Sequence, residues 1–108
     1  MKPLRVASWN VNGLRAVMRK GFTRWLEASR PDIVALQELR ALPEQAEDEL
    51  QRLKGWAHVL TPAQRKGYSG VGTFSTFTPD EVRDSLGGRG FDASHFDAEG
   101  RVHLVRYG

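Results

Sequence analysis

Two stretches decide the fold of this chain: residues 8–15, SWNVNGLR, and residues 31–38, PDIVALQE. Each is a short apolar run that ends in polar side chains able to hold a metal. Apolar side chains at helical spacing lie between them, so the segment predicts a βαβ unit with two parallel strands and a right-handed crossover. The carboxyl ends of the strands would meet at one edge of the sheet, where ligands bind in open α/β folds. We therefore expect Asn10, Asn12 and Glu38 to lie within reach of one site.

The other segments predict further strands and one more helix. The helix of the βαβ unit can be interrupted at Gly21, in which case its first turn is loop, and Pro31 stops it. A second helix is predicted to begin at Pro43 and to end before Gly55. The run at 33–36 is continuously apolar, as in a strand covered on both faces. Strands are expected at 4–9, 33–36, 56–61, 69–77, 81–86 and 102–107, with a basic loop at 62–68 and a long loop at 87–100.

Composition limits the class of protein. The chain has 108 residues, which suits one domain, and its formal net charge of +3 mildly favours a polyanionic partner such as nucleic acid. It contains no cysteine, so a disulfide framework and a cysteine metal site are excluded, and a reducing compartment is consistent with this. We find neither a signal peptide nor an apolar run of membrane-spanning length. We expect a cytoplasmic protein without a membrane partner, associated with the nucleoid if it is bacterial.

Three side chains at the ends of the first two strands are candidates for chemistry. Glu38 is a hard oxygen ligand suited to Mg²⁺ or Mn²⁺, which one or two carboxylates can hold together with water and substrate phosphate. The alternative is an acid bonded to a neighbouring turn. Asn10 and Asn12 can donate to an oxyanion or orient a carboxylate, but spacing alone favours ordinary turn chemistry for both. Spacing alone leaves these alternatives open.

Four motifs together resemble one family of nucleases. They are the two stretches above, Gly67-Tyr68-Ser69-Gly70-Val71-Gly72, and Glu99-Gly100-Arg101-Val102. In this order they are similar to the exonuclease III family of apurinic/apyrimidinic endonucleases. The first motif also occurs in inositol polyphosphate 5-phosphatases, whereas the third is typical of the DNA-repair branch.

The resemblance implies a fold, a reaction and a set of residues. The fold would be an α/β protein, the N-terminal half of a four-layer DNase I-like sandwich, with a mixed sheet opened by the βαβ unit. The reaction would be Mg²⁺-dependent cleavage 5′ to abasic sites, or removal of 3′ nucleotides, in double-stranded DNA by a monomeric enzyme. Asn10, Asn12 and Glu38 would be catalytic, with Glu38 and Asn10 at the metal. Arg15, Tyr68 and Arg101 would contact DNA.

Two departures from the family pattern qualify these expectations. Arg40 replaces a usual lysine and keeps its charge. The later family motifs, which supply the water-activating residue and a phosphate-stabilising histidine, are not among these 108 residues. Residues 1–108 therefore resemble a partial domain, expected to be inactive and poorly folded or self-associated alone.

His58, His95 and His103 fit none of the missing motifs and are interpreted as ordinary surface or strand histidines. The alternatives are another phosphodiesterase or phosphatase of the superfamily, and a non-enzymatic remnant that binds nucleic acid weakly.

Overall fold

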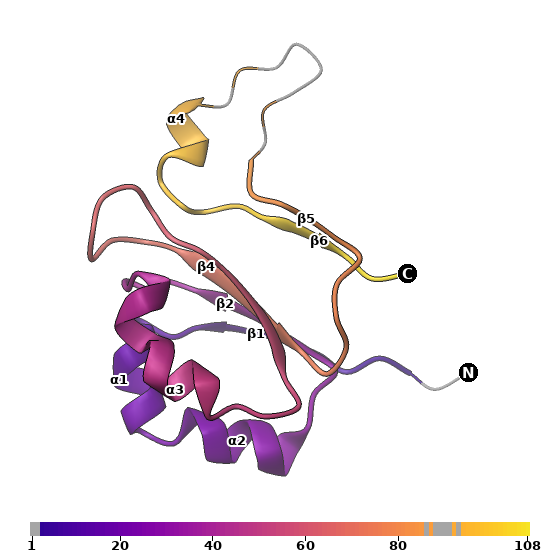
Figure 1. Cartoon of the computed structure of the whole chain (residues 1–108). Coiled ribbons are helices and arrows are strands. Elements are labelled where there is room, and N and C mark those ends of the chain that lie inside the picture. Colours follow the sequence, from indigo (N-terminus) through magenta and orange to yellow (C-terminus); the bar gives the residue numbers. More distant parts are fainter. Residues whose placement is uncertain (1–2, 86, 88–91, 93) are drawn as a thin grey trace.

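The chain is a mixed α/β structure, seen here in a computed structural model that describes residues 3–85, 87, 92 and 94–108 (Figure 1). None of the helices in this described part is long and apolar enough to cross a membrane. The elements, in chain order, are β1 (Val6–Asn10), α1 (Leu14–Arg19), α2 (Phe22–Ser29), β2 (Ile33–Gln37), the 3-10 helix η1 (Pro43–Ala46), α3 (Glu47–Gln51), β3 (Ala57–Thr61), β4 (Val71–Ser75), β5 (Glu81–Arg83), α4 (Ser94–Asp97) and β6 (Leu104–Arg106).

A four-stranded mixed sheet forms the centre of the molecule, in the order β1-β2-β4-β3. β1 and β2 are parallel, in a register that pairs Asn10 with Gln37, and β4 runs antiparallel to both β2 and β3. The predicted α/β class, the mixed sheet and the opening βαβ unit are confirmed. Because β1 and β2 end at the same edge, the residues that follow them are brought together there.

Helices α1, α2 and α3 and the apolar core lie on one face of this sheet, whereas α4 lies on the side of the second sheet (Figure 1). The crossover is two helices, α1 and α2, separated at Gly21, whose φ of 107° is in the left-handed region that favours glycine. The first turn is helical, and so the loop alternative for it is wrong. Alternate residues of the strands, such as Val34 and Leu36, point toward the helices, as do Phe22 and Leu26 toward the sheet. Core side chains in this cluster are Val11, Leu14, Val17, Met18, Phe22, Leu26, Val34, Leu36, Leu39, Ala46, Leu50, Leu53 and Phe74.

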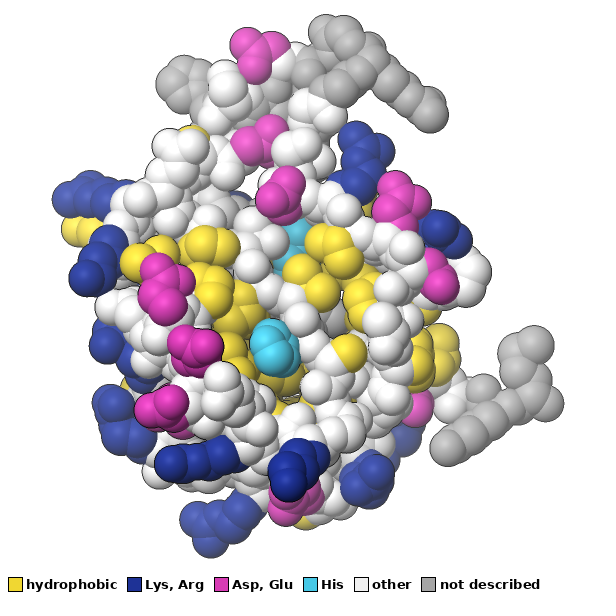
Figure 2. Space-filling model, viewed as in Figure 1, with side chains coloured by type: hydrophobic (Ala, Val, Ile, Leu, Met, Phe, Trp, Pro, Cys, Tyr) yellow, Lys and Arg dark blue, Asp and Glu magenta, His cyan; other side chains and the backbone are white. Residues whose placement is uncertain are grey.

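The opposite face of the sheet carries a small second sheet, in which β5 pairs with β6 in antiparallel fashion. The strand expected at 102–107 is observed as the shorter β6 of this second sheet. Thr73 and Ser75 present hydroxyl groups on this face, and side chains from the last strand region bond to them. Figure 2 has the same view as Figure 1, with the helices and the second sheet on opposite sides of the central sheet, and shows apolar side chains in the middle of this side of the molecule.

The strand at Ile33–Gln37 is covered less evenly than predicted. Val34 and Leu36 are buried under the helices, whereas Ile33 and Ala35 are only partly buried on the side of the second sheet. A hollow of about 440 Å³ separates them from Val105 and Tyr107. The expectation of burial on both faces therefore holds for only one face.

A short helix, α4, lies within the segment that was expected to be a long loop. Its first backbone N–H, from Ser94, donates to Oδ1 of Asp92 at 3.0 Å, and this hydrogen bond holds the pKa of Asp92 below its usual range. Four residues without an apolar repeat give no helical periodicity, so the sequence pattern could not reveal this helix. Residues 86, 88–91 and 93 of the expected strand and loop lie outside the described residues.

Gly100 fixes the end of this segment against the loop after β3. It is buried, its φ is +61°, and a Cβ added to it would lie 2.3 Å from the backbone nitrogen of Ala63. Gly55 provides a comparison, because its φ is +83° but nothing lies within 4 Å of an added Cβ. The close approach at Gly100 is therefore a steric requirement in addition to a conformational one.

We predict that Gly100→Ala lowers the free energy of unfolding by at least about 2 kcal/mol, because backbone atoms must move to admit the methyl group. The matched variant Gly55→Ala should lower it by only about 1 kcal/mol, the cost of its positive φ. Urea unfolding followed by circular dichroism measures both. Equal losses in the two variants would contradict the close approach at Gly100.

Candidate metal and nucleic-acid site

Backbone hydrogen bonds join the loops that follow β1 and β2. Val11 N–H donates to the Gln37 carbonyl at 3.0 Å, and Gly13 N–H donates to the Glu38 carbonyl at 2.8 Å. These bonds extend the parallel pairing of the strands beyond their ends. The loop that carries Asn12 is therefore held directly beside Glu38, as the two N-terminal motifs predict.

The other two motifs are joined to the same edge. Leu39 N–H donates to the Gly70 carbonyl at 3.1 Å, and Arg40 N–H donates to the Ser69 carbonyl at 2.7 Å. Gly70 N–H donates in turn to the Gly100 carbonyl at 2.9 Å. Four segments spread over ninety positions of the sequence thus meet through main-chain contacts, which do not depend on side-chain flexibility.

The backbone at this edge is strained. Five non-glycine residues of the described chain have positive φ, and four of them lie here: Asn12 at 49°, Glu38 at 58°, Arg40 at 51° and Ser69 at 37°. Such conformations cost about 1–3 kcal/mol each and cluster at ligand sites, where the surrounding structure fixes them. At Glu38 the left-handed conformation ends β2, which fixes the direction in which the carboxylate leaves the sheet.

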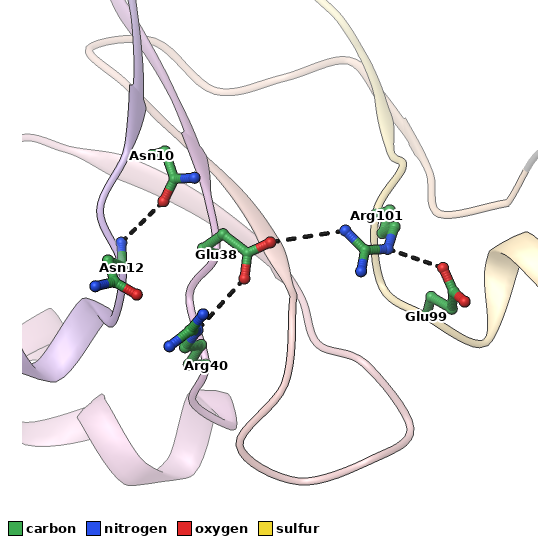
Figure 3. A network of polar contacts seen from close by, with 6 residues as sticks. All are labelled: Asn10, Asn12, Glu38, Arg40, Glu99 and Arg101. Carbon is green, nitrogen blue, oxygen red and sulfur yellow. Dashed lines mark hydrogen bonds and ion pairs between the residues drawn. The ribbon is translucent and has the colours of Figure 1, made fainter.

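The Glu38 carboxylate lies between two arginines (Figure 3). Its Oε2 is 3.4 Å from Nε of Arg40, and its Oε1 is 3.6 Å from Nη1 of Arg101. Both distances exceed the roughly 2.7–2.9 Å of a strong charge-assisted hydrogen bond. The Glu38 side chain is 24% exposed, so its oxygens remain accessible to a further ligand. Arg101 also donates from Nε to Glu99 at 2.8 Å.

Asn10 and Asn12 form a turn. The Asn12 N–H donates to Oδ1 of Asn10 at 3.1 Å, and both residues are exposed (Figure 3). The turn alternative that spacing left open is therefore present at Asn10. It does not exclude a role at a metal or phosphate, because a carbonyl oxygen has a second lone pair and the Asn10 amide nitrogen keeps its two donors.

These donors fit Mg²⁺ better than a metal that needs a dense set of protein ligands. The described residues contain no group of three His, Asp or Glu side chains arranged to hold a metal ion. Mg²⁺ usually keeps several waters and takes one or two carboxylates with substrate phosphate. Glu38 offers one such carboxylate, whereas the oxygen of the Asn10 amide points to the Asn12 N–H (Figure 3).

Arg15 faces a hollow of about 300 Å³ that two other arginines share. Its lining includes Arg15 and Arg19 from α1 and Arg40 from the loop after β2. Arg40 thus links this hollow to Glu38. Sequence reasoning assigned no role to Arg19, although the four-residue spacing from Arg15 places both on one helix face and could have indicated it.

Tyr68 stands apart from these groups. Its side chain is 51% exposed, and the Arg65 guanidinium lies 4.0 Å from the centre of its ring, a cation–π contact. The contacts described for Tyr68 do not reach Glu38. The structure thus unites Glu38 with Arg101 and Asn10 with Asn12, while Tyr68 is connected only through the adjoining Ser69 and Gly70 backbone.

His103 differs from an ordinary surface histidine. Its ring lies between two hydroxyl groups: Nδ1 is 3.0 Å from Oγ1 of Thr61, and Nε2 is 2.7 Å from Oγ1 of Thr73. Burial lowers the pKa of His103, with a smaller opposing effect from Asp84. His58 lies on β3 with its ring beside Phe74. Partial burial of the ring lowers the pKa of His58 as well. The side chain of His95 lies outside the described residues.

Comparison with protein families gives the site its context. Residues 7–106 match the model of the Endonuclease/Exonuclease/phosphatase family. This chain belongs to that family. A DNA-(apurinic or apyrimidinic site) endonuclease from Dictyostelium discoideum is 34% identical over 96% of the chain and 27% of its own length. An exodeoxyribonuclease from Bacillus subtilis is 37% identical over 96% of the chain and 38% of its own length.

Solved structures of family members confirm the fold. The catalytic domain of Xenopus laevis APE2 superimposes with a TM-score of 0.75 at 28% identity, covering 94% of this chain and 38% of the APE2 domain. A 3′-5′ exonuclease from Neisseria meningitidis gives a TM-score of 0.72 at 27% identity, covering 94% of this chain and 37% of the exonuclease. The family resemblance predicted from the motifs is confirmed. The chain spans between about a quarter and two fifths of the length of these relatives.

The lowered pKa of His103 leads to a prediction about pH. The unfolded chain binds a proton near pH 6.5 and the folded chain only at lower pH, so the unfolded state binds more protons in between. The contribution of His103 to the free energy of unfolding should therefore be fully present above pH 6.5. It should be lost as the pH decreases through the pKa of His103 in the folded chain. Urea unfolding between pH 7.5 and 5 measures this. In His103→Gln the loss of unfolding free energy at low pH should be smaller, with the contribution of His58 remaining. A pH dependence equal to that of wild type would contradict the prediction.

Proposed function

We propose that this chain carries the metal-binding end and part of the DNA-contacting surface of a Mg²⁺-dependent DNA repair nuclease. The reaction would be cleavage of the phosphodiester 5′ to an abasic site, removal of 3′ nucleotides, or both. The observation that carries the proposal is the accessible Glu38 carboxylate beside Arg101, at a sheet edge where four motif loops are hydrogen-bonded together. The names of the relatives, an apurinic or apyrimidinic site endonuclease and an exodeoxyribonuclease, point to DNA as the substrate.

Each site residue has a role that follows from its position. Glu38 would hold the metal, with Asn10 as a second oxygen donor. Asn12 would fix the Asn10 amide through the turn hydrogen bond. When bound, Mg²⁺ neutralises charge on the scissile phosphate and polarises the attacking water, and Mn²⁺ can supply the same chemistry. Arg15, Tyr68 and Arg101 would contact the DNA backbone, since phosphate contacts position a protein on a duplex.

Residues 1–108 would form part of a longer catalytic domain. A family nuclease needs a positioned base for the water and a group that stabilises the phosphate charge, in addition to the metal. The resemblance places both in later motifs. We therefore assign DNA cleavage to the longer protein, and metal and DNA binding to this part of it.

DNA binding by the 108-residue chain tests this function directly. Fluorescence anisotropy with a duplex containing one abasic analogue should show tighter binding in the presence of Mg²⁺ than in its absence. An undamaged duplex and an inositol polyphosphate serve as competitors. Preferential displacement by the inositol polyphosphate would favour the alternative superfamily phosphatase, and weak binding without an effect of Mg²⁺ would favour a non-enzymatic remnant.

Glu38→Gln should weaken Mn²⁺ binding at least about tenfold, because the substitution removes the only charged ligand that we assign to the metal. Titration followed by electron paramagnetic resonance of free Mn²⁺ measures the affinity without any need for activity. Glu81→Gln is the matched control, since Glu81 is also paired with an arginine, Arg106 at 3.2 Å, but lies on β5. Equal affinities for wild type and Glu38→Gln would remove Glu38 from the metal site.

Arg15→Ala and Arg101→Ala should each weaken binding to all duplex sequences alike. Loss of one phosphate contact reduces the slope of log affinity against log salt concentration by about 1. Anisotropy titrations at several NaCl concentrations measure the slope. Arg83→Ala on β5 provides the control, and a slope that changes as much in Arg83→Ala would indicate diffuse charge attraction instead of a site.

A further inference from the structure

The second sheet is attached to the first mainly through polar contacts. The buried apolar cluster of the described residues ends at Phe74 in sequence and includes nothing from β5 or β6. Leu104 of β6 is 53% exposed, and a hollow of about 440 Å³ lies between β6 and the central sheet. Apolar packing therefore contributes little to the position of the segment that leads into β6 and places Arg101 near Glu38.

His103, two residues after Arg101, supplies a side-chain contact to the central sheet. It reaches across the layers to Thr61 on β3 and Thr73 on β4 with both ring nitrogens, at 3.0 and 2.7 Å. These threonines lie on the same face of neighbouring strands, since Thr61 pairs with Val71, two residues before Thr73. A neutral imidazole donates from one nitrogen and accepts at the other, and a hydroxyl group can do either. Either tautomer of the ring can therefore be held between the two hydroxyl groups.

Arg101 lies between two fixed points. On one side Gly100 accepts a hydrogen bond from Gly70 N–H and approaches the Ala63 backbone closely. On the other side, His103 is held by the two threonines. We propose that His103 is a positioning residue, which acts through this two-point attachment to place the Arg101 guanidinium beside the Glu38 carboxylate. The inference rests on the proposed function of that site and extends it to a residue that touches neither metal nor DNA.

The contact is suited to positioning because its loss need not unfold the chain. His103 lines the hollow between the sheets, so the hydroxyl groups of Thr61 and Thr73 can be hydrated when the imidazole is removed. Helices α1, α2 and α3 and the core lie on the other face of the central sheet. His103→Leu should therefore leave a folded protein in which the Arg101 segment is free to move.

A double-mutant cycle between His103 and Arg101 tests the proposal by binding to an abasic-analogue duplex. We expect Arg101→Ala to weaken binding about tenfold, as for loss of one charged contact, and His103→Leu to weaken it by a similar factor. If His103 acts through Arg101, the double variant should bind no more weakly than Arg101→Ala alone. The same cycle with Arg15→Ala is the matched control, in which the two losses should multiply to within about twofold. Multiplying losses in both cycles would overturn the proposal.

A second measurement requires no DNA. Because Nε of Arg101 donates to Glu99 while Nη1 of the same guanidinium lies 3.6 Å from Glu38, the Nε–Hε signal of Arg101 in an NMR spectrum should differ from that of a free arginine. His103→Leu and Thr73→Val should move this signal toward the free position. His58→Leu should not, and His103→Gln, which can still bond to hydroxyl groups, should restore it in part. A signal unmoved in both His103→Leu and Thr73→Val would refute positioning. Shifted signals without any DNA binding by wild type would refute only the proposed function.

Discussion

The site depends on main-chain hydrogen bonds between loops that the sheet brings to one edge. The loop after β1 is bonded to the Glu38 carbonyl, and the loop after β2 is bonded to Ser69 and Gly70, which are bonded in turn to Gly100. Each such bond contributes about 0.5–1.5 kcal/mol net, while each left-handed non-glycine residue here costs about 1–3 kcal/mol. The two contributions are therefore of similar size. Burial of Leu14 and Leu39, which are both 0% exposed and adjoin the strained turns, stabilises these turns further.

Electrostatics explains why such an edge suits a polyanion. Four arginines gather here, since Arg40 and Arg101 lie beside Glu38 and Arg15 and Arg19 share a hollow with Arg40. They outnumber the two carboxylates paired with them, Glu38 and Glu99, so the local charge is positive. A bound divalent cation would increase that positive charge. Phosphate groups of a nucleic acid can balance it, and the long distances from Glu38 to both arginines leave their guanidinium groups able to turn toward an incoming phosphate. Metal and DNA should for this reason support each other's binding.

Sequence patterns could predict the elements whose cause is local. The polar residues after two apolar runs located the edge, and Gly21 and Pro31 marked the limits of α2 because their backbone requirements do not depend on the fold. Contacts between distant segments were not predictable in this way. The residues at 102–107 do not indicate that their strand pairs with β5 in a separate sheet. The residues around His103 likewise do not indicate that Thr61 and Thr73 lie on either side of its ring. From the sequence, Arg40 was seen only to keep the positive charge of the family's usual lysine. Its pairing with Glu38 could not be foreseen, because it requires the left-handed backbone at both residues.

The two faces of the central sheet consequently give the site two kinds of support. Glu38, Asn10 and Asn12 leave strands and turns that adjoin the apolar core, where local opening must expose buried leucine and phenylalanine side chains. Arg101 is carried by a strand region fastened through His103, the Tyr107–Ser75 hydrogen bond and the ring contact between Phe77 and Tyr107. Regions with few buried apolar contacts open at lower free energy than the core. A rigid half that presents Glu38, the proposed metal ligand, faces an adjustable half that presents Arg101, the proposed phosphate contact, and this arrangement would accommodate a duplex without disturbing the geometry at Glu38. That division follows from how each face of the central sheet is covered: Val34, Leu36 and Phe74 are fully buried under the helices, whereas Ile33 and Ala35 on the other face are only partly buried.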